Sequence, residues 1–133
     1  MDDIFVGRVM SSEVITVTPE TDIEDAASLL MERGIGSLVV VDDNNQPAGI
    51  LTNTDFVRLV AEGDPESETT VEDHMSREVA TIGVHDDIQT AANRLITFNI
   101  HHLPVVDDTE GVVGMLSTAD LASYISDVET PLP

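Results

Sequence analysis

Two short segments of the sequence place a hydroxyl side chain three residues before a carboxylate. Residues 49–55 read GILTNTD, and residues 114–120 read GMLSTAD, 65 positions later. The pairs Thr52 with Asp55 and Ser117 with Asp120 have the spacing of a helix capping box. At an open cleft, the same helix N-terminus can bind a phosphate, and its carboxylate can accept from both hydroxyls of a ribose. The spacing therefore fits helix capping alone, or capping combined with nucleotide binding.

The two segments belong to a duplication. Residues 6–60 align without a gap on residues 71–125, with identical residues at 20 of the 55 positions. A unit repeated at a fixed period usually cannot bury its apolar face alone, so we expect the copies to pack together with the functional sites between them. We predict a first repeat at 1–63, an acidic linker at 64–70 within a solvated joining stretch that extends to 73, a second repeat at 71–126 and a flexible tail at 127–133.

Each copy predicts a strand, a helix, two strands and a second helix. In the first copy the strands are expected at 14–17, 38–41 and 48–51, and the helices at 21–33 and 52–61. The first helix should begin in a capping box of Thr21 and Glu24 and end at left-handed Gly34; Asp86, Gln89 and Asn99 take these places in the second copy. The second copy should have its hairpin at 103–106 and 112–116.

Apolar side chains at helical spacing predict which helix faces are buried. The expected inner positions are Ile23, Ala26, Ala27, Leu30, Met31, Phe56, Leu59 and Val60 in the first copy, and Ile88, Ala91, Ala92, Leu95, Ile96, Leu121, Tyr124 and Ile125 in the second.

The composition indicates a folded protein with a strongly acidic surface. The chain of 133 residues has 26 Asp and Glu against 5 basic residues, all Arg, and a net charge of −21. A disordered acidic chain would be poor in apolar residues, yet 41% of these residues are hydrophobic. Because salt at ~1 M shortens the Debye length to about 3 Å, such a surface suits a halophilic, salt-accumulating cell. An ordinary acidic protein is the alternative.

The composition also limits which partners and which kinds of protein we expect. Nucleic acids and anionic membranes bind clustered Lys and Arg, so neither is an expected partner. No stretch reaches the ~18 apolar residues that span a bilayer, and the N-terminus lacks the basic region of a signal peptide, so we expect a cytoplasmic protein. The absence of Cys excludes disulfides, thiolate metal sites and a Cys nucleophile. Without a Gly-rich phosphate loop either, we do not expect an enzyme.

The repeated unit, the LPVVD segment at 103–107, the LVVVD segment at 38–42 and the two seven-residue motifs together resemble the cystathionine-β-synthase (CBS) domain pair, also called a Bateman module. The resemblance covers residues 6–125. It implies an α/β (α+β) fold of tandem βαββα repeats, with two small sheets packed in pseudo-two-fold symmetry. It also implies a regulatory module that binds adenosine-containing ligands between its repeats, commonly forms a homodimer and acts on an effector protein.

The resemblance assigns roles to individual residues. Thr52 and Ser117 would face phosphate, and Asp55 and Asp120 would bind ribose. The opposite repeat would complete each cleft with its first strand and the entrance of its second strand. The cleft of Asp55 would be completed by Met75, Glu78, Ala80, Ile100, His101 and His102, and the cleft of Asp120 by Met10, Glu13, Ile15, Ile35, Gly36 and Ser37. Core packing is the alternative for the Ile and Met residues.

The predicted clefts differ at the entrance of the second strand. His101 and His102 stand where some relatives carry His and Arg against phosphates, whereas the first copy has Gly36 and Ser37. A solvated loop or a metal contact is the alternative for the two histidines. If His102 binds phosphate as an imidazolium, affinity should fall as the pH rises through about 6.5.

The ligand class follows from charge. Many relatives carry Arg before the motif carboxylate, where this chain has Thr54 and Ala119. Together with the net charge of −21, this favours AMP or S-adenosylmethionine over ATP as a regulatory ligand. Since helix capping alone satisfies the motif residues, a ligand-free module for dimerisation or scaffolding is the alternative function.

Overall fold

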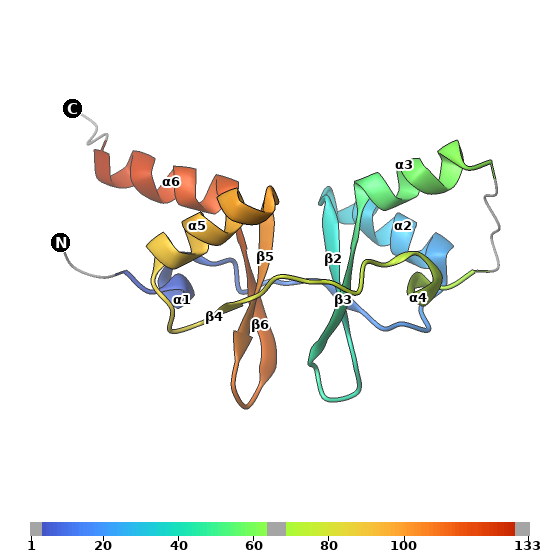
Figure 1. Ribbon diagram of the computed structural model, residues 1–133, viewed down its shortest axis with the longest axis horizontal. Coiled ribbons are helices and arrows are strands. Elements are labelled where there is room, and N and C mark those ends of the chain that lie inside the picture. Colours follow the sequence, from blue (N-terminus) through green and yellow to red (C-terminus); the bar gives the residue numbers. More distant parts are fainter. Residues whose placement is uncertain (1–3, 64–68, 130–133) are drawn as a thin grey trace. The chain divides into compact units, whose positions relative to one another are not determined.

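The computed structural model describes residues 4–63 and 69–129, and it forms two compact units (Figure 1). The first, here called the Asp55 unit, consists of residues 15–79. The second, the Asp120 unit, joins the residues before 15 to those from 80 onward. The unit boundaries therefore lie at other positions than the repeat boundaries at 63 and 71 that the sequence predicts. They differ because the segment that opens each repeat packs within the unit formed by the rest of the other repeat.

The Asp55 unit has a three-stranded mixed sheet in the order β1-β2-β3. Strand β1 runs parallel to β2, and β2 pairs antiparallel with β3. Its elements are β1 (Thr16–Val17), α2 (Ile23–Arg33), β2 (Ser37–Val41), β3 (Pro47–Thr52), α3 (Asn53–Ala61) and α4 (Val71–His74).

The Asp120 unit repeats this arrangement in the order β4-β5-β6. Its elements are α1 (Val6–Val9), β4 (Ile82–Gly83), α5 (Ile88–Phe98), β5 (His102–Asp107), β6 (Gly111–Ser117) and α6 (Thr118–Glu129). The predicted βαββα order and the α+β class are confirmed, and the short helices α1 and α4 are additions. How the two sheets pack on each other stays a prediction. Within residues 4–63 and 69–129, no helix combines the length and apolar character needed to cross a membrane.

The predicted capping boxes at the start of α2 and α5 are wrong. The Thr21 hydroxyl accepts from the Thr18 amide at 3.1 Å, and the N-cap of α2 is Asp22, whose side chain makes no capping bond. In α5 the N-cap is Asp87, which accepts from an amide of the first helical turn at 2.8 Å. Asp86 instead accepts from an amide of the preceding turn. The side chains predicted to cap thus close the turn before each helix, and the cap lies one residue later.

The C-terminal ends of the same helices follow the prediction. Gly34 ends α2 with φ 61° and ψ 39°, and Asn99 ends α5 with φ 54° and ψ 50°. Both conformations are left-handed, which glycine adopts without steric cost and asparagine tolerates better than most residues. Two different residue types therefore specify the same helix end.

Each unit has its own apolar core. In the Asp55 unit the buried members are Val17, Ile23, Ala26, Leu30, Leu38, Val40, Leu51 and Val71. In the Asp120 unit they are Val6, Ile82, Ala91, Leu95, Leu103, Val105 and Leu116. Val6 and Val71 come from the short helices α1 and α4 and are fully buried. Each core therefore includes a side chain from the segment that opens the other repeat.

Four positions predicted to face inward are exposed. Met31 is 84% exposed and Ile96 78%, although both continue the apolar stripe of their helix, and Val60 and Ile125 are 68% and 55% exposed. Helices α2 and α5 bury only part of their apolar stripe: Ile23, Ala26 and Leu30 are the buried residues of α2, and Ala91 and Leu95 those of α5. The rest of the stripe faces away from the core.

Two predicted boundaries also need correction. The solvated joining stretch was expected to extend to residue 73, but Val71 is fully buried and the Thr69 carbonyl accepts from the Ile23 amide at 2.9 Å. Residues 64–68 of the predicted linker lie outside the described part. The tail was expected from residue 127, yet α6 runs to Glu129, since neither glycine nor proline interrupts it before Pro131. Residues 130–133 lie outside the described part.

A short antiparallel bridge ties each opening segment to the last strand of its unit. Ile50 and Ser76 exchange two backbone hydrogen bonds of 2.9 Å each. Ser11 and Met115 exchange equivalent bonds of 2.8 and 2.9 Å. The glycines that open the two motifs allow this approach, because a Cβ at Gly49 would lie 2.7 Å from the Ser76 carbonyl oxygen. The motif glycine is therefore a steric requirement for the bridge.

Substitution of Gly49 by Ala tests this packing. Its Cβ would lie 2.6 Å from the sulfur of Met75 as well as against the backbone of Ser76, so we expect a loss of about 1–3 kcal/mol in the free energy of unfolding. Gly36→Ala is the matched control, since its Cβ would meet only the Asn53 side chain, at 3.4 Å, and should change stability by less than about 0.5 kcal/mol. Urea unfolding of both variants measures the difference. Equal stability of the two variants would contradict the steric account.

Candidate functional site

The two hydroxyl-carboxylate pairs lie where the last strand of each unit passes into the following helix. The Thr52 amide donates to Asp55 Oδ2 at 2.8 Å, and the two residues form a capping box at the start of α3. The Ser117 amide donates to Asp120 Oδ2 at 2.9 Å, and the Asp120 amide donates to Ser117 Oγ at 3.0 Å. The capping function of both pairs is confirmed. One carboxylate oxygen of each pair is thereby engaged by the backbone.

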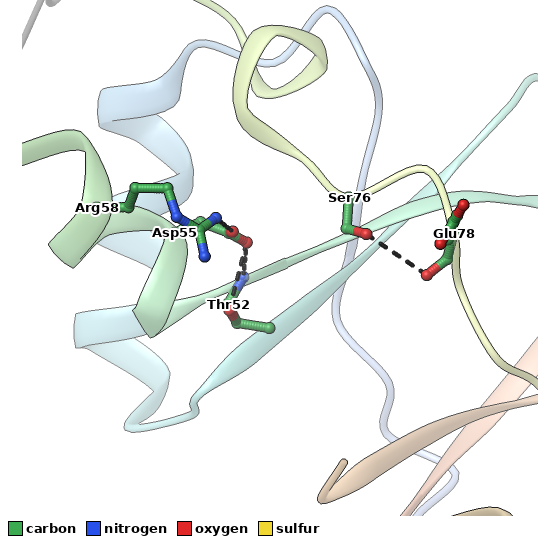
Figure 2. Close-up of polar contacts among 5 residues, drawn as sticks. All are labelled: Thr52, Asp55, Arg58, Ser76 and Glu78. Carbon is green, nitrogen blue, oxygen red and sulfur yellow. Dashed lines mark hydrogen bonds and ion pairs between the residues drawn. The ribbon is translucent and has the colours of Figure 1, made fainter. Parts of the chain in front are cut away.

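Arg58 is a member of the Asp55 site that the sequence prediction missed. Its Nη1 atom lies 3.3 Å from Asp55 Oδ1, on the oxygen that the Thr52 amide does not use. Figure 2 shows its side chain reaching along α3 to the carboxylate, with Thr52 beside it. The Asp55 side chain is 11% exposed and the Arg58 side chain 62%. The signal was present in the sequence, because residues three apart on a helix are neighbours.

The first helical amide of α3 and of α6 is already paired. The Asn53 amide donates to the Gly36 carbonyl at 3.1 Å, and the Thr118 amide donates to the His101 carbonyl at 3.0 Å. These bonds fix the entrance of the second strand against the helix N-terminus in each unit. They also leave fewer amides for a phosphate than an open helix N-terminus would offer.

Each predicted ligand set is divided between the two units. The Asp55 unit holds Thr52, Asp55, Met75, Glu78, Ile15, Ile35, Gly36 and Ser37. The Asp120 unit holds Ser117, Asp120, Met10, Glu13, Ala80, Ile100, His101 and His102. Met10 and Glu13 therefore lie in the same unit as Asp120, the motif predicted for them. Met75 and Glu78 lie in the same unit as Asp55. The second-strand entrances lie beside the motif of their own repeat, and their contribution to the other motif stays a prediction.

Strand register shows how close each entrance is to its motif. Ser37 is the antiparallel partner of Thr52, and His102 is the partner of Ser117. Ser37 is 6% exposed, whereas His101 is exposed and His102 is half-buried. The two units therefore present different side chains at the same place, a small buried hydroxyl in one and a pair of imidazoles in the other.

The apolar members of the predicted sets contribute to the cores. Ile15, Ile35 and Met75 pack partly buried against the core of the Asp55 unit. Met10, Ala80 and Ile100 do the same in the Asp120 unit. These contacts support the core-packing alternative while leaving part of each side chain accessible. Glu13 and Glu78 are exposed, and the Glu78 carbonyl accepts from the Ser76 hydroxyl at 3.4 Å, as Figure 2 shows.

At the Asp120 motif, the environment of His102 clearly shifts the pKa of its imidazole. Partial burial lowers its pKa from 6.5, the neighbouring His101 lowers it further, and the Asp120 carboxylate opposes both effects. The ring is therefore mainly neutral at pH 7. Among the described residues, no group of three or more His, Cys, Asp or Glu side chains is placed to hold a metal ion, so His101 and His102 form no such cluster there.

Solved structures of similar chains match this fold over nearly its whole length. The CBS domain pair of protein MJ0100, in complex with 5′-methylthioadenosine and S-adenosyl-L-methionine, is 28% identical with a TM-score of 0.85, covering 96% of this chain and 99% of that chain. The protein CBSX2 in complex with AMP is 25% identical with a TM-score of 0.84, covering 94% and 98%.

Similar proteins are also found by sequence. The protein MK0525 of Methanopyrus kandleri, described as uncharacterized, is 32% identical over 122 residues, which are 91% of this chain and 62% of that protein. The homoserine O-acetyltransferase of Methanosalsum zhilinae is 31% identical over 125 residues, and the match covers only 25% of its length. The chain thus spans a part of these relatives.

The family assignment rests on both repeats. The CBS domain model matches residues 6–62 and again residues 71–127. Both matches include the hydroxyl-carboxylate motif and the strands and helices described above. The chain therefore belongs to the CBS domain family, and its two domains in tandem make it a Bateman module.

Proposed function

We propose that this CBS pair is a regulatory sensor that binds adenosine-containing ligands at the Asp55 and Asp120 motifs and modulates a partner protein. The observation that carries the proposal is the placement of each motif: a carboxylate and a hydroxyl at a helix N-terminus, beside a segment contributed by the other repeat. The solved pairs with 28% and 25% identity hold 5′-methylthioadenosine, S-adenosyl-L-methionine or AMP, which supports this ligand class.

The proposed roles follow from the chemistry of the side chains. Asp55 and Asp120 accept from ribose hydroxyls through the carboxylate oxygen that the backbone amide does not use. Thr52 and Ser117 face the 5′ substituent, and the partly exposed edges of Met75 and Met10 contact the base. Regulation requires that the ligand bind two arrangements of the chain with different affinity, since equal affinity would shift no equilibrium. The regulated partner is a protein, and the module itself performs no catalysis.

A ligand-free module for dimerisation or scaffolding is the second candidate, and a specific observation favours it. Each unit exposes large apolar side chains on its helices: Met31, Val57 and Val60 in one, and Ile96, Phe98 and Ile125 in the other. We propose that these faces support a homodimer under either function. Dimerisation alone does not separate the two candidates, whereas stabilisation by an adenosyl ligand does.

Replacement of the motif carboxylates tests ligand binding. With a ligand at about 100 times its dissociation constant, we expect a stabilisation of about 2.7 kcal/mol in the parent protein. Asp55→Ala and Asp120→Ala together should abolish it. Each substitution also removes the carboxylate half of a capping box, so the ligand-induced change in melting temperature is compared with each variant's own ligand-free value. A panel of AMP, S-adenosylmethionine, 5′-methylthioadenosine and ATP that stabilises neither parent nor variants would favour the scaffold.

The pH dependence of AMP affinity tests the role of His102. Because its pKa lies below 6.5 in the free protein, the ring becomes a cation only as the pH falls below that value. A bound phosphate favours the cation, so we expect AMP affinity in the parent, relative to His102→Asn, to increase as the pH is lowered from 7.5 toward 5.5. The comparison cancels the protonation of AMP itself, whose phosphate titrates at ~6. The neutral ligand 5′-methylthioadenosine and the variant His102→Asn serve as controls. An AMP profile identical in parent and variant would remove His102 from the site.

The salt dependence of stability tests the proposed adaptation to a halophilic cytoplasm. With a net charge of −21, repulsion across the surface should destabilise the protein in dilute buffer. We expect the melting temperature to rise between low and molar KCl, because the Debye length shortens from about 10 Å at 0.1 M to about 3 Å at 1 M. A flat response would indicate an ordinary acidic protein.

A further inference from the structure

The two motif carboxylates differ in their partners. Asp55 Oδ2 accepts from the Thr52 amide at 2.8 Å, and Asp55 Oδ1 lies 3.3 Å from the guanidinium of Arg58 (Figure 2). Both oxygens are therefore engaged, and a permanent cation stands at the group assigned to the ribose. Only 11% of the Asp55 side chain is exposed, so a ligand reaches this carboxylate in the immediate vicinity of Arg58.

Asp120 has no counterpart of this ion pair among residues 4–63 and 69–129. The residue 65 positions after Arg58 is Ser123, which is exposed and neutral. Within the part of the chain that the structure describes, Asp120 is bonded to Ser117 and has no ion pair. The titratable neighbour is His102, whose burial keeps it mainly neutral at pH 7. The duplication has thus preserved the carboxylate and changed the charge beside it.

A cation at this place acts on the 5′ end of an adenosyl ligand. When ribose hydroxyls donate to Asp55, the guanidinium keeps its charge and has other donors to offer, because Arg carries five N–H groups. At a separation of roughly 10 Å in water without added salt, each unit of charge on a 5′ substituent changes affinity about twofold. Salt at ~1 M removes most of this effect, because the Debye length is then about 3 Å. An anionic substituent is attracted, and a sulfonium is repelled.

We propose that Arg58 determines ligand charge at the Asp55 motif, so that this motif selects adenosyl ligands with an anionic 5′ substituent while the Asp120 motif accepts neutral or cationic ones. The inference rests on the proposed function, since it presumes that the carboxylates bind ribose. It goes further in assigning different ligand classes to the two motifs and in naming the residue responsible.

Three ligands that share the adenosine group test the charge preference. AMP carries a phosphate of about −1.5 to −2 at pH 7, 5′-methylthioadenosine is neutral and S-adenosylmethionine is a net cation. Calorimetry at about 0.01 M KCl, where the Debye length is about 30 Å, measures their affinities in an Asp120→Ala background, which leaves the Asp55 motif. Arg58→Ser should reduce the preference for AMP over S-adenosylmethionine by about tenfold, with 5′-methylthioadenosine changing least. Arg58→Lys keeps the charge and should stay within about twofold of its parent.

The converse substitution uses the other motif. In an Asp55→Ala background, Ser123→Arg should increase the preference for AMP over S-adenosylmethionine by about tenfold. Arg58 and Ser123 are both exposed, so neither Arg58→Ser nor Ser123→Arg disturbs a core.

The outcomes distinguish a failure of the charge preference from a failure of the proposed sensor function. If the ligands bind and the motif carboxylates are required, but Arg58→Ser keeps the parent's relative affinities, the charge preference is wrong and the sensor function stands. If none of the three ligands binds the parent protein, both are wrong.

Discussion

The close approach of two backbones in each unit determines how this protein is built. Ser76 and Ile50 exchange hydrogen bonds in one unit, and Ser11 and Met115 do so in the other. This approach is possible only where the third strand carries glycine, because any Cβ at Gly49 would overlap the neighbouring carbonyl. The bridge in turn places Val71 or Val6 in a core that the other repeat supplies. Neither unit is therefore complete without residues from both repeats.

The same constraint positions the candidate site. The motif begins with the glycine that allows the bridge, continues through two strand residues and ends in a capping box, so packing, strand pairing and helix initiation are satisfied within seven residues. The carboxylate therefore caps the following helix whether or not a ligand is bound. The surroundings of the carboxylate are where the two units diverge: Arg58 pairs with Asp55, whereas Asp120 has no ion pair among the described residues. A duplicated scaffold can thus keep its geometry while its two motifs acquire different electrostatics.

The sequence predicted the order of elements well because the signals were local and repeated. Gly34 and Asn99 end their helices as expected, and the motif pairs cap as expected. The errors arise where a competing local hydrogen bond or the small area of the sheet decides. Thr21 had the spacing of a cap but closes a turn, and Met31 continues an apolar stripe that the small sheet cannot cover. The spacing of residues could not predict the exchange of opening segments. The same spacing fits a segment packed on its own repeat and a segment packed on the other repeat.

The exchange of opening segments is also the claim most open to direct test, because the chain has no Cys of its own. A hydrogen-bonded antiparallel pair has a Cα separation of about 5.5 Å, which a disulfide can span. We predict that Ile50→Cys with Ser76→Cys closes an intramolecular disulfide under mild oxidation, and that Ser76→Cys with Met115→Cys does not. Mass spectrometry of the oxidised monomers reads out both variants. Closure of the second pair and failure of the first would show that each segment stays with its own repeat and would contradict the account.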